Sequence, residues 1–151
     1  IGGSGPLQAE LQDRIVSEGL EGKVELAGRI PDESIPLYFN ACDVFCMSSI
    51  WKTEAFGIVQ IEAMSCGKPV VATRIPGSGV SWVNEHGVSG LNVEPCNAQE
   101  LARAIMDITA SPEIYAKFSE GAQTRYRECF TKRKMIDSCL DIYRKLLILK
   151  D

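Results

Sequence analysis

Short apolar runs that alternate with helical patterns constrain the fold of this chain more than any other feature. After a strand remnant at Ile1, these runs predict strands over residues 23–30, 43–49, 68–73 and 90–95. The intervening periodicity and glycine or proline punctuation predict helices over residues 6–18, 32–41, 57–66 and 98–108. Strands and helices that alternate at this spacing build a parallel sheet. We therefore expect an α/β fold with helices on both faces of the sheet.

The C-terminal end is expected to be all-helical. A helical turn at 81–85 is followed later by helices over 112–128 and 131–150. Asp32 is expected to cap the helix over 32–41, because a side-chain oxygen there can accept a free N–H. Two helices should bury an apolar stripe, formed by Leu101, Ile105 and Ile108 in one and by Met135, Ile136, Leu140, Tyr143 and Leu147 in the other.

Length and charge narrow the class of protein. The 151 residues are enough for one ordinary domain, and the net charge of −4 comes without any basic cluster that could follow a phosphate backbone. We therefore expect no nucleic-acid partner. No apolar run reaches the length of a membrane span, and no leader pattern opens the chain. Ile1 lacks a preceding methionine and leads at once into a glycine turn, which suggests a piece of a longer polypeptide.

The cysteines and the single histidine do not suggest a metal site or a catalytic histidine. Six cysteines occur without CxxC or Cys/His spacing, and four lie in apolar elements. We expect them to be reduced core residues of a cytosolic protein, with no metal site. His86 lies in the turn "NEHGVSG" and is expected at the surface.

Two carboxylates, Glu54 and Glu62, stand out in the otherwise apolar stretch "TEAFGIVQIEAMSCGKPVVAT". A helix begins between them, directly after a strand-end loop, so its free N–H groups point to the edge where parallel sheets bind ligands. If the whole span were helical, the acids would lie on the order of 12 Å apart. That is longer than the separation in a glycosidase pair and suits a nucleoside diphosphate sugar, with sugar hydroxyls at one acid and a ribose diol at the other.

Less specific interpretations of the same residues remain open at this point. Glu54 could be a solvated loop acid, and Glu62 could form an ion pair with Lys68 or Arg74. The ring of Phe56 is expected to pack, so that only its backbone would meet a ligand. The N-terminal glycine turn fails the GxGxxG dinucleotide pattern, because Gln8 stands at the third glycine position.

The stretch "EAFGIVQIEAMSCGKPVVAT" resembles the E-x-F-G-x-x-x-x-E-A-x-x-x-G-x-P-V-V-A signature of retaining glycosyltransferases of family 4, the glycosyl transferases group 1. That family has the two-lobed GT-B fold. The resemblance extends to the flanking segments "IGGSGP", "VELAGRIP", "YFNACDVFCMSS" and "HGVSGLNVEP", in the same order, and covers residues 1 to about 108.

The resemblance implies roles for individual residues. Glu54 would contact the hydroxyls of the donor sugar and stabilise the charge that develops at the anomeric carbon, and Glu62 would bind the ribose. The nucleotide base would lie against the loop of Arg29, Ile30 and Pro31. Backbone groups of three residues would meet sugar and phosphate: Phe56, Gly57 and Ile58. Two glycines, Gly3 and Gly5, would keep the N-terminal turn low beside the nucleotide.

This chain departs from the family pattern in one loop. Where the family has a glycine pair followed by Pro-Glu, the sequence is "PGSGVSWVNE", with Ser81 and Trp82 in that place. This leaves the donor-sugar or acceptor side of the site open. The family's cationic pair for the diphosphate, and its acceptor-binding lobe, would both precede Ile1.

These observations predict a single nucleotide-sugar-binding domain over residues 1–151, the Rossmann-like C-terminal lobe of a cytoplasmic GT-B enzyme. The enzyme would move a hexose from a nucleoside diphosphate sugar to an acceptor sugar or glycolipid, without metal or cofactor. The missing lobe could add peripheral membrane association, and this piece alone should be inactive. Two alternatives stay open: a nucleotide-sugar epimerase of the same fold, and a non-catalytic α/β nucleotide-binding or partner-docking module.

Overall fold

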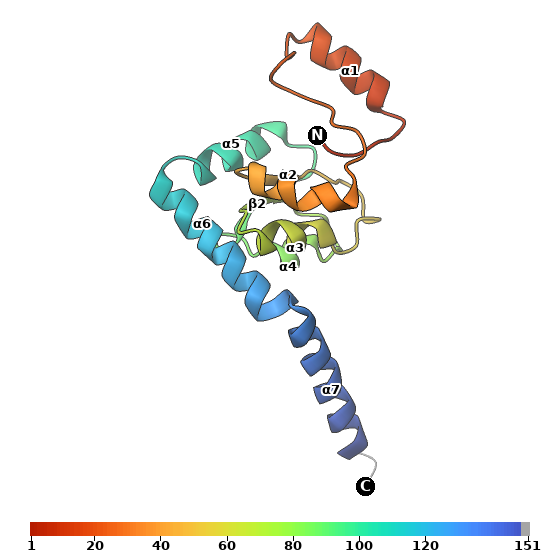
Figure 1. Ribbon diagram of the computed structural model, residues 1–151, viewed down its shortest axis with the longest axis vertical. Helices are drawn as coiled ribbons and strands as arrows, with labels where there is room; N and C mark the ends of the chain where they lie inside the picture. The colour runs from red at the N-terminus through yellow and green to blue at the C-terminus, as the bar shows by residue number, and fades with distance from the viewer. Residues whose placement is uncertain (149–151) are drawn as a thin grey trace. The chain divides into compact units, whose positions relative to one another are not determined.

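The computed structural model describes residues 1–148. The chain divides into two compact units, Ile1–Tyr38 and the part from Phe39 onward, which are described separately below. Figure 1 shows the order of the elements along the chain. No helix in residues 1–148 is long and apolar enough to cross a membrane.

The first unit consists of a glycine turn, helix α1 (Gln8–Ser17) and an extended return segment. Ile1 and Gly3 pair with that segment through Ala27 N–H to Ile1 O at 2.9 Å and Gly3 N–H to Gly28 O at 2.7 Å. The strand expected over 23–30 is wrong in extent, because the pairing amounts to one parallel bridge between Gly2 and Gly28.

A 3₁₀ turn, η1 (Asp32–Ser34), runs directly into helix α2 (Ile35–Ala41). The prediction that Asp32 caps this helix is wrong. Pro31 occupies the cap position with extended backbone, and Asp32 lies inside the first turn. A carboxylate at that position still favours the positive end of a helix dipole.

The second unit is built on a three-stranded parallel sheet in the order β1-β2-β3, with β1 (Phe45–Met47), β2 (Val70–Thr73) and β3 (Gly90–Val93). All four residues of β2 are buried, as expected for a parallel strand covered on both faces. Gly90 cannot carry a side chain, because a Cβ there would overlap the backbone of Val70 in the neighbouring strand.

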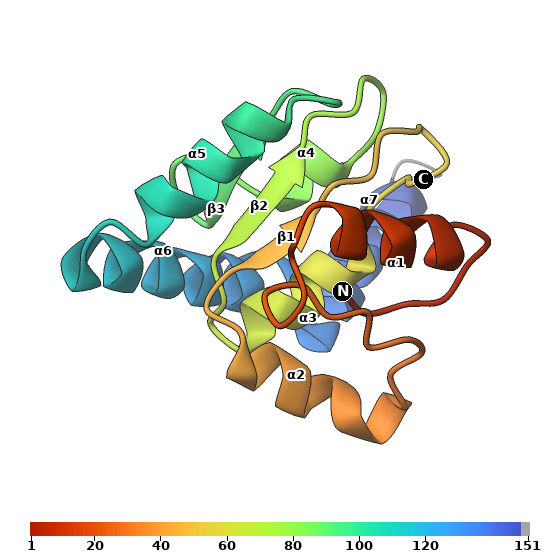
Figure 2. The same cartoon turned by 90° about the horizontal axis from the view of Figure 1, so that it is seen from above.

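Helices α3 (Ile58–Ser65) and α5 (Ala98–Ile108) cover opposite faces of this sheet, and α4 (Val80–Val83) lies beside β2 (Figure 2). The core on the α5 side joins Val71 and Val93 of the sheet to Ala104 and Ile108. The expected stripe of α5 is confirmed, since Leu101 and Ile105 pack against the same cluster as Ile108. The parallel sheet flanked by helices confirms the predicted α/β class.

Helix α6 (Pro112–Arg125) continues through a π-helical turn, η2 (Tyr126–Phe130), into α7 (Lys132–Ile148). The prediction that α7 buries an inner stripe is wrong. Its apolar residues are 43–67% exposed, because in the described part of the chain no sheet or helix face covers them: Met135, Ile136, Leu140, Tyr143 and Leu147. The expected end of this helix at Lys150 lies outside the described residues.

The cysteines are free but do not form the core. Cys42 and Cys66 are half-buried, and the other four are exposed. Burial raises the pKa of the Cys42 thiol, which keeps it protonated and unreactive. Among the described residues, no group of three or more His, Cys, Asp or Glu could hold a metal ion.

Candidate functional site

Helix α3 begins at the carboxyl edge of the sheet with a glycine in the left-handed conformation. Gly57 has φ of 73° at the N-cap position, and its N–H donates to Glu54 Oε1 at 3.0 Å. Glu54 is therefore a half-buried acid held against the helix N-terminus rather than a free loop acid. In the part of the chain that the structure describes, its second carboxylate oxygen has no hydrogen-bond donor. One oxygen shapes the turn, and the other can accept a bond from a ligand hydroxyl.

The space beside Gly57 is filled by two side chains. A Cβ at this position would overlap the side-chain amide of Gln60 and lie 2.9 Å from Met47 Cε. The amide of Gln60 is fully buried and donates to Phe56 O and Val80 O, each at 3.4 Å. Gln60 thus connects the first turn of α3 to α4. Its signal in the sequence is an uncharged polar residue that stands between apolar neighbours in "IVQIEA", two positions before Glu62.

Glu62 is exposed on α3, and no cation is paired with it among residues 1–148. The alternative that it pairs with Lys68 or Arg74 is wrong. Lys68 Nζ donates to Asn40 O at 2.9 Å, and Arg74 forms an ion pair with Glu94 at 2.6 Å. The carboxylate of Glu62 remains accessible from solvent.

The loop before α4 is joined to the segment that carries Glu54. Ser78 Oγ donates to Glu54 O at 2.6 Å, and Gly79 N–H donates to Ala55 O at 2.7 Å. The ring of Phe56 packs against Gly79, where a Cβ would lie 3.0 Å from Phe56 Cδ2. The ring therefore makes packing contacts, as expected, although Phe56 is 38% exposed. The two loops that follow β1 and β2 therefore form one connected edge.

Ile58, the first residue of α3, is exposed, and the other five predicted site residues lie in the first unit. Gly3 and Gly5 are exposed in the N-terminal turn, as are Arg29 and Pro31, while Ile30 is half-buried. Ile30 packs over Gly2, where a Cβ would lie 2.6 Å from its Cδ1. The first unit therefore brings the glycine turn next to the 29–31 loop, and a cavity of about 290 Å³ adjoins the turn.

A parallel sheet with an anion-favouring helix start and accessible carboxylates at its carboxyl edge is the architecture of a Rossmann-like nucleotide-binding lobe. The model of the family "Glycosyl transferases group 1" matches residues 1–125. The chain belongs to this family, and its fold is that of the Rossmann-like lobe of GT-B enzymes.

Proteins of similar sequence are named as glycosyltransferases. The chain is 32% identical over 147 residues to the O-antigen chain mannosyltransferase C of Escherichia coli, covering 97% of this chain and 39% of that protein. It is 34% identical over 131 residues to the D-rhamnosyltransferase WbpZ of Pseudomonas aeruginosa, covering 87% of this chain and 34% of that protein. This chain thus spans between a third and two fifths of the length of these two relatives.

Solved structures of similar fold also align over nearly the whole of this chain and about two fifths of their own length. The crystal structure of Anabaena Alr3699/HepE in complex with UDP superposes with a TM-score of 0.83 at 32% identity, covering 95% of this chain and 40% of that one. A complex of the same protein with UDP-glucose gives 0.81 at 31% identity, again over 95% of this chain and 40% of that one.

Proposed function

We propose that this chain is the donor-binding lobe of a retaining glycosyltransferase, which moves a hexose from a nucleoside diphosphate sugar to an acceptor hydroxyl. The observation that carries the proposal is the arrangement of α3. Glu54 holds one carboxylate oxygen against the helix N-terminus and leaves the other unbonded, while Glu62 stays accessible further along the same helix. The UDP and UDP-glucose complexes of the Anabaena relative support a nucleotide sugar as the donor.

Each part of α3 has a distinct task in this proposal. The N–H of Ile58 in its first turn faces the diphosphate, because a helix N-terminus favours anions, while the Gly57 N–H is held by Glu54. Glu54 accepts hydrogen bonds from the sugar hydroxyls and stabilises positive charge at the anomeric carbon as the diphosphate departs. Glu62 accepts both hydroxyls of the ribose. The 29–31 loop and the glycine turn line the base.

The remaining parts of the proposal concern the whole enzyme. The acceptor is a sugar or glycolipid in polysaccharide or glycolipid synthesis, and the reaction takes place in the cytoplasm, with peripheral membrane association as a further option. The reaction needs no metal ion or cofactor, because helix N–H groups and cationic side chains neutralise the diphosphate. This chain alone is expected to bind the donor without catalysis.

A titration of the ¹⁵N-labelled chain with UDP and with GDP tests the proposal directly. We expect amide shifts at residues 57–62 and 29–31, with a Kd of roughly 1 mM, and the base with the larger shifts is the preferred donor base. If the amide chemical shifts of both segments stayed unchanged with UDP and with GDP, the proposal would be contradicted.

The variant Glu62→Gln separates this function from a partner-docking module. Loss of a charged acceptor for the ribose should raise the nucleotide Kd at least about fivefold. Glu120→Gln, which changes an exposed glutamate of α6, is the matched control and should leave the Kd unchanged. Equal affinity of the wild type and Glu62→Gln would favour the docking module instead.

The geometry around His86 disfavours the epimerase alternative. The residue lies between α4 and β3, and therefore at the amino edge of the parallel sheet, opposite to Glu54. Its Nδ1 accepts the N–H of Asn92 at 3.0 Å. A proton-transfer role at the donor sugar would require a histidine at the carboxyl edge.

A further inference from the structure

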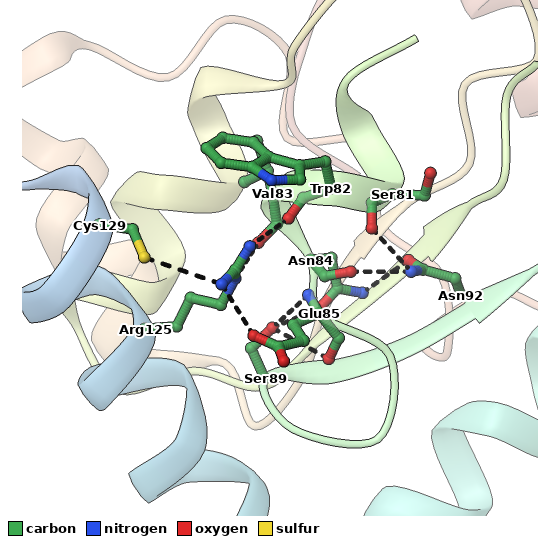
Figure 3. A network of polar contacts seen from close by, with 9 residues as sticks. All are labelled: Ser81, Trp82, Val83, Asn84, Glu85, Ser89, Asn92, Arg125 and Cys129. Atoms are coloured by element: carbon green, nitrogen blue, oxygen red, sulfur yellow. Dashed lines mark hydrogen bonds and ion pairs between the residues drawn. The ribbon is translucent and has the colours of Figure 1, made fainter. Parts of the chain in front are cut away.

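Arg125, the last residue of α6, lies at the centre of the polar network in Figure 3. Its Nε donates to Val83 O at 3.1 Å, and Nη2 donates to Trp82 O at 2.5 Å. Nη1 pairs with Glu85 Oε2 at 2.7 Å and also faces Cys129 Sγ at 3.7 Å. The side chain is only 14% exposed, so these bonds hold a largely desolvated cation in one place.

The carbonyls that Arg125 engages belong to the C-terminal end of α4. The last carbonyls of a helix have no partner within the helix, and a cation there also complements the dipole. The four-residue helix α4 is too short to hold its own orientation by internal bonds. The orientation of α4 is therefore set by the contacts that its two ends make with other segments.

Aromatic rings add further contacts to Arg125 at the C-terminal end of α4. The guanidinium lies 5.4 Å from the ring centroid of Trp82 and 5.6 Å from that of Phe130. The Trp82 ring in turn lies 5.9 Å from Phe56 and 5.5 Å from Phe130, between centroids. Phe56 is two residues after Glu54, so the cluster reaches the segment that carries the candidate catalytic acid.

The residues that precede α4 are also bonded to the segment that carries Glu54. Ser78 and Gly79, which lead into α4, bond to the carbonyls of Glu54 and Ala55. A displacement of α4 would therefore move the backbone from which the Glu54 carboxylate projects.

We propose that Arg125 is a positioning residue for the transfer reaction: by clamping α4 and Trp82, it sets the orientation of Glu54 toward the donor sugar. This rests on the function proposed above. The role requires arginine, because only a planar guanidinium can reach two carbonyls, a carboxylate and two aromatic rings at once. Lysine would keep the ion pair with Glu85 and lose the geometry.

The test compares Arg125→Lys with Arg127→Lys, a matched control that changes an exposed arginine outside the clamp. UDP and UDP-glucose are the probes, because only UDP-glucose carries the sugar that Glu54 contacts. In Arg125→Lys we expect the UDP-glucose affinity to fall at least threefold while the UDP affinity stays within twofold. Amide exchange at Gly57 and Gly79 should become at least tenfold faster, and in Arg127→Lys both measurements should stay close to the wild type.

A merely structural role predicts a different result. Parallel loss of UDP and UDP-glucose affinity, or unchanged exchange at Gly57 and Gly79 in Arg125→Lys, would overturn the proposal. Should Arg125→Lys fail to fold, Ser78→Ala is the second variant, because it removes the hydrogen bond from the start of α4 to Glu54 O. Unchanged UDP-glucose binding in Ser78→Ala would also overturn the proposal. If the wild type binds neither probe, the proposed function fails, and the exchange rate at Gly57 alone decides whether Arg125 positions this segment.

Discussion

At the scale of single residues, backbone conformation and close contact decide which side chains the candidate site tolerates. Gly57 combines both constraints, since φ is 73° and the place of a Cβ is already occupied by the side chains of Gln60 and Met47. Gly87 has a similar φ of 81° but open space around it. The pair therefore separates backbone strain from crowding.

We expect Gly57→Ala to lower the free energy of unfolding by about 2–4 kcal/mol, because crowding adds to the strain of a left-handed backbone. Gly87→Ala should cost only about 1 kcal/mol, the strain alone. Urea denaturation of both variants measures the difference. Equal costs would mean that Gln60 and Met47 move aside freely.

Asn84 is a buried side-chain amide whose N–H groups face several acceptors. Asn84 is fully buried, and its Nδ2, which carries two hydrogens, lies 3.0–3.1 Å from three acceptors: Val70 O, Leu91 O and Asn92 Oδ1. Figure 3 shows the contact with Asn92. Asn84→Asp would place an ionised oxygen against three acceptors, so we expect a loss of at least about 2–3 kcal/mol at pH 7.

The loss in Asn84→Asp should shrink in acid. Burial among acceptors raises the pKa of the folded-state aspartate above its unfolded value of about 3.9, so the folded state is favoured below that pH and loses stability as pH rises. Unfolding of the variant and the wild type from pH 3 to 7 measures this. A gap between the two proteins that stays constant with pH would contradict the expectation.

At the scale of elements, capping determines where helices begin. Asn97 accepts the N–H of Glu100 at 3.0 Å, and Glu100 Oε2 accepts from Glu94 N–H and from Asn97 Nδ2, each at 3.1 Å. This reciprocal arrangement is like a capping box at the start of α5, except that Glu100 accepts from the side-chain amide of the cap residue instead of its backbone N–H. It anchors the helix that covers one face of the sheet.

Asn97→Ala should lower the free energy of unfolding by about 1 kcal/mol, because the first turn of α5 loses its acceptor. Asn97→Ser keeps an acceptor, places no second carboxylate against Glu100, and should stay within about 0.5 kcal/mol of the wild type. Thermal unfolding of the two variants is the measurement. An alanine variant as stable as Asn97→Ser would show that the cap contributes nothing here.

At the scale of the whole molecule, the apolar stripes of α5 and α7 have different surroundings. Ile108 of α5 is fully buried, whereas Leu140 of α7 is 44% exposed. Burial rather than hydrophobicity sets the cost of a deletion.

Ile108→Ala should therefore cost about 2–5 kcal/mol of stability, and Leu140→Ala less than about 1 kcal/mol. Denaturant unfolding of this 151-residue chain measures both. A cost for Leu140→Ala equal to that for Ile108→Ala would show that α7 is covered in solution.

Local pattern alone was sufficient for the alternation of elements and for locating the two acids beside and on α3. The 98–108 helix was predicted with its observed bounds, and the parallel strands were located to within a few residues, because periodicity and punctuation act over neighbouring residues. Glu54 and Glu62 stood out because ionised groups are rare in an apolar run. Their roles stay proposals.

Other features depend on packing between distant parts of the chain. Periodicity indicates that α7 has an apolar stripe, but not whether anything covers it. Nor does it show that the 23–30 segment pairs through a single bridge, between Gly2 and Gly28. Arg125 bonds to carbonyls 42 and 43 residues away, and no local pattern encodes such a contact. Gln60 and Arg125 became visible only once α3, α4 and α6 had been brought together, because the partners of a side chain are chosen by tertiary packing and not by its neighbours in sequence.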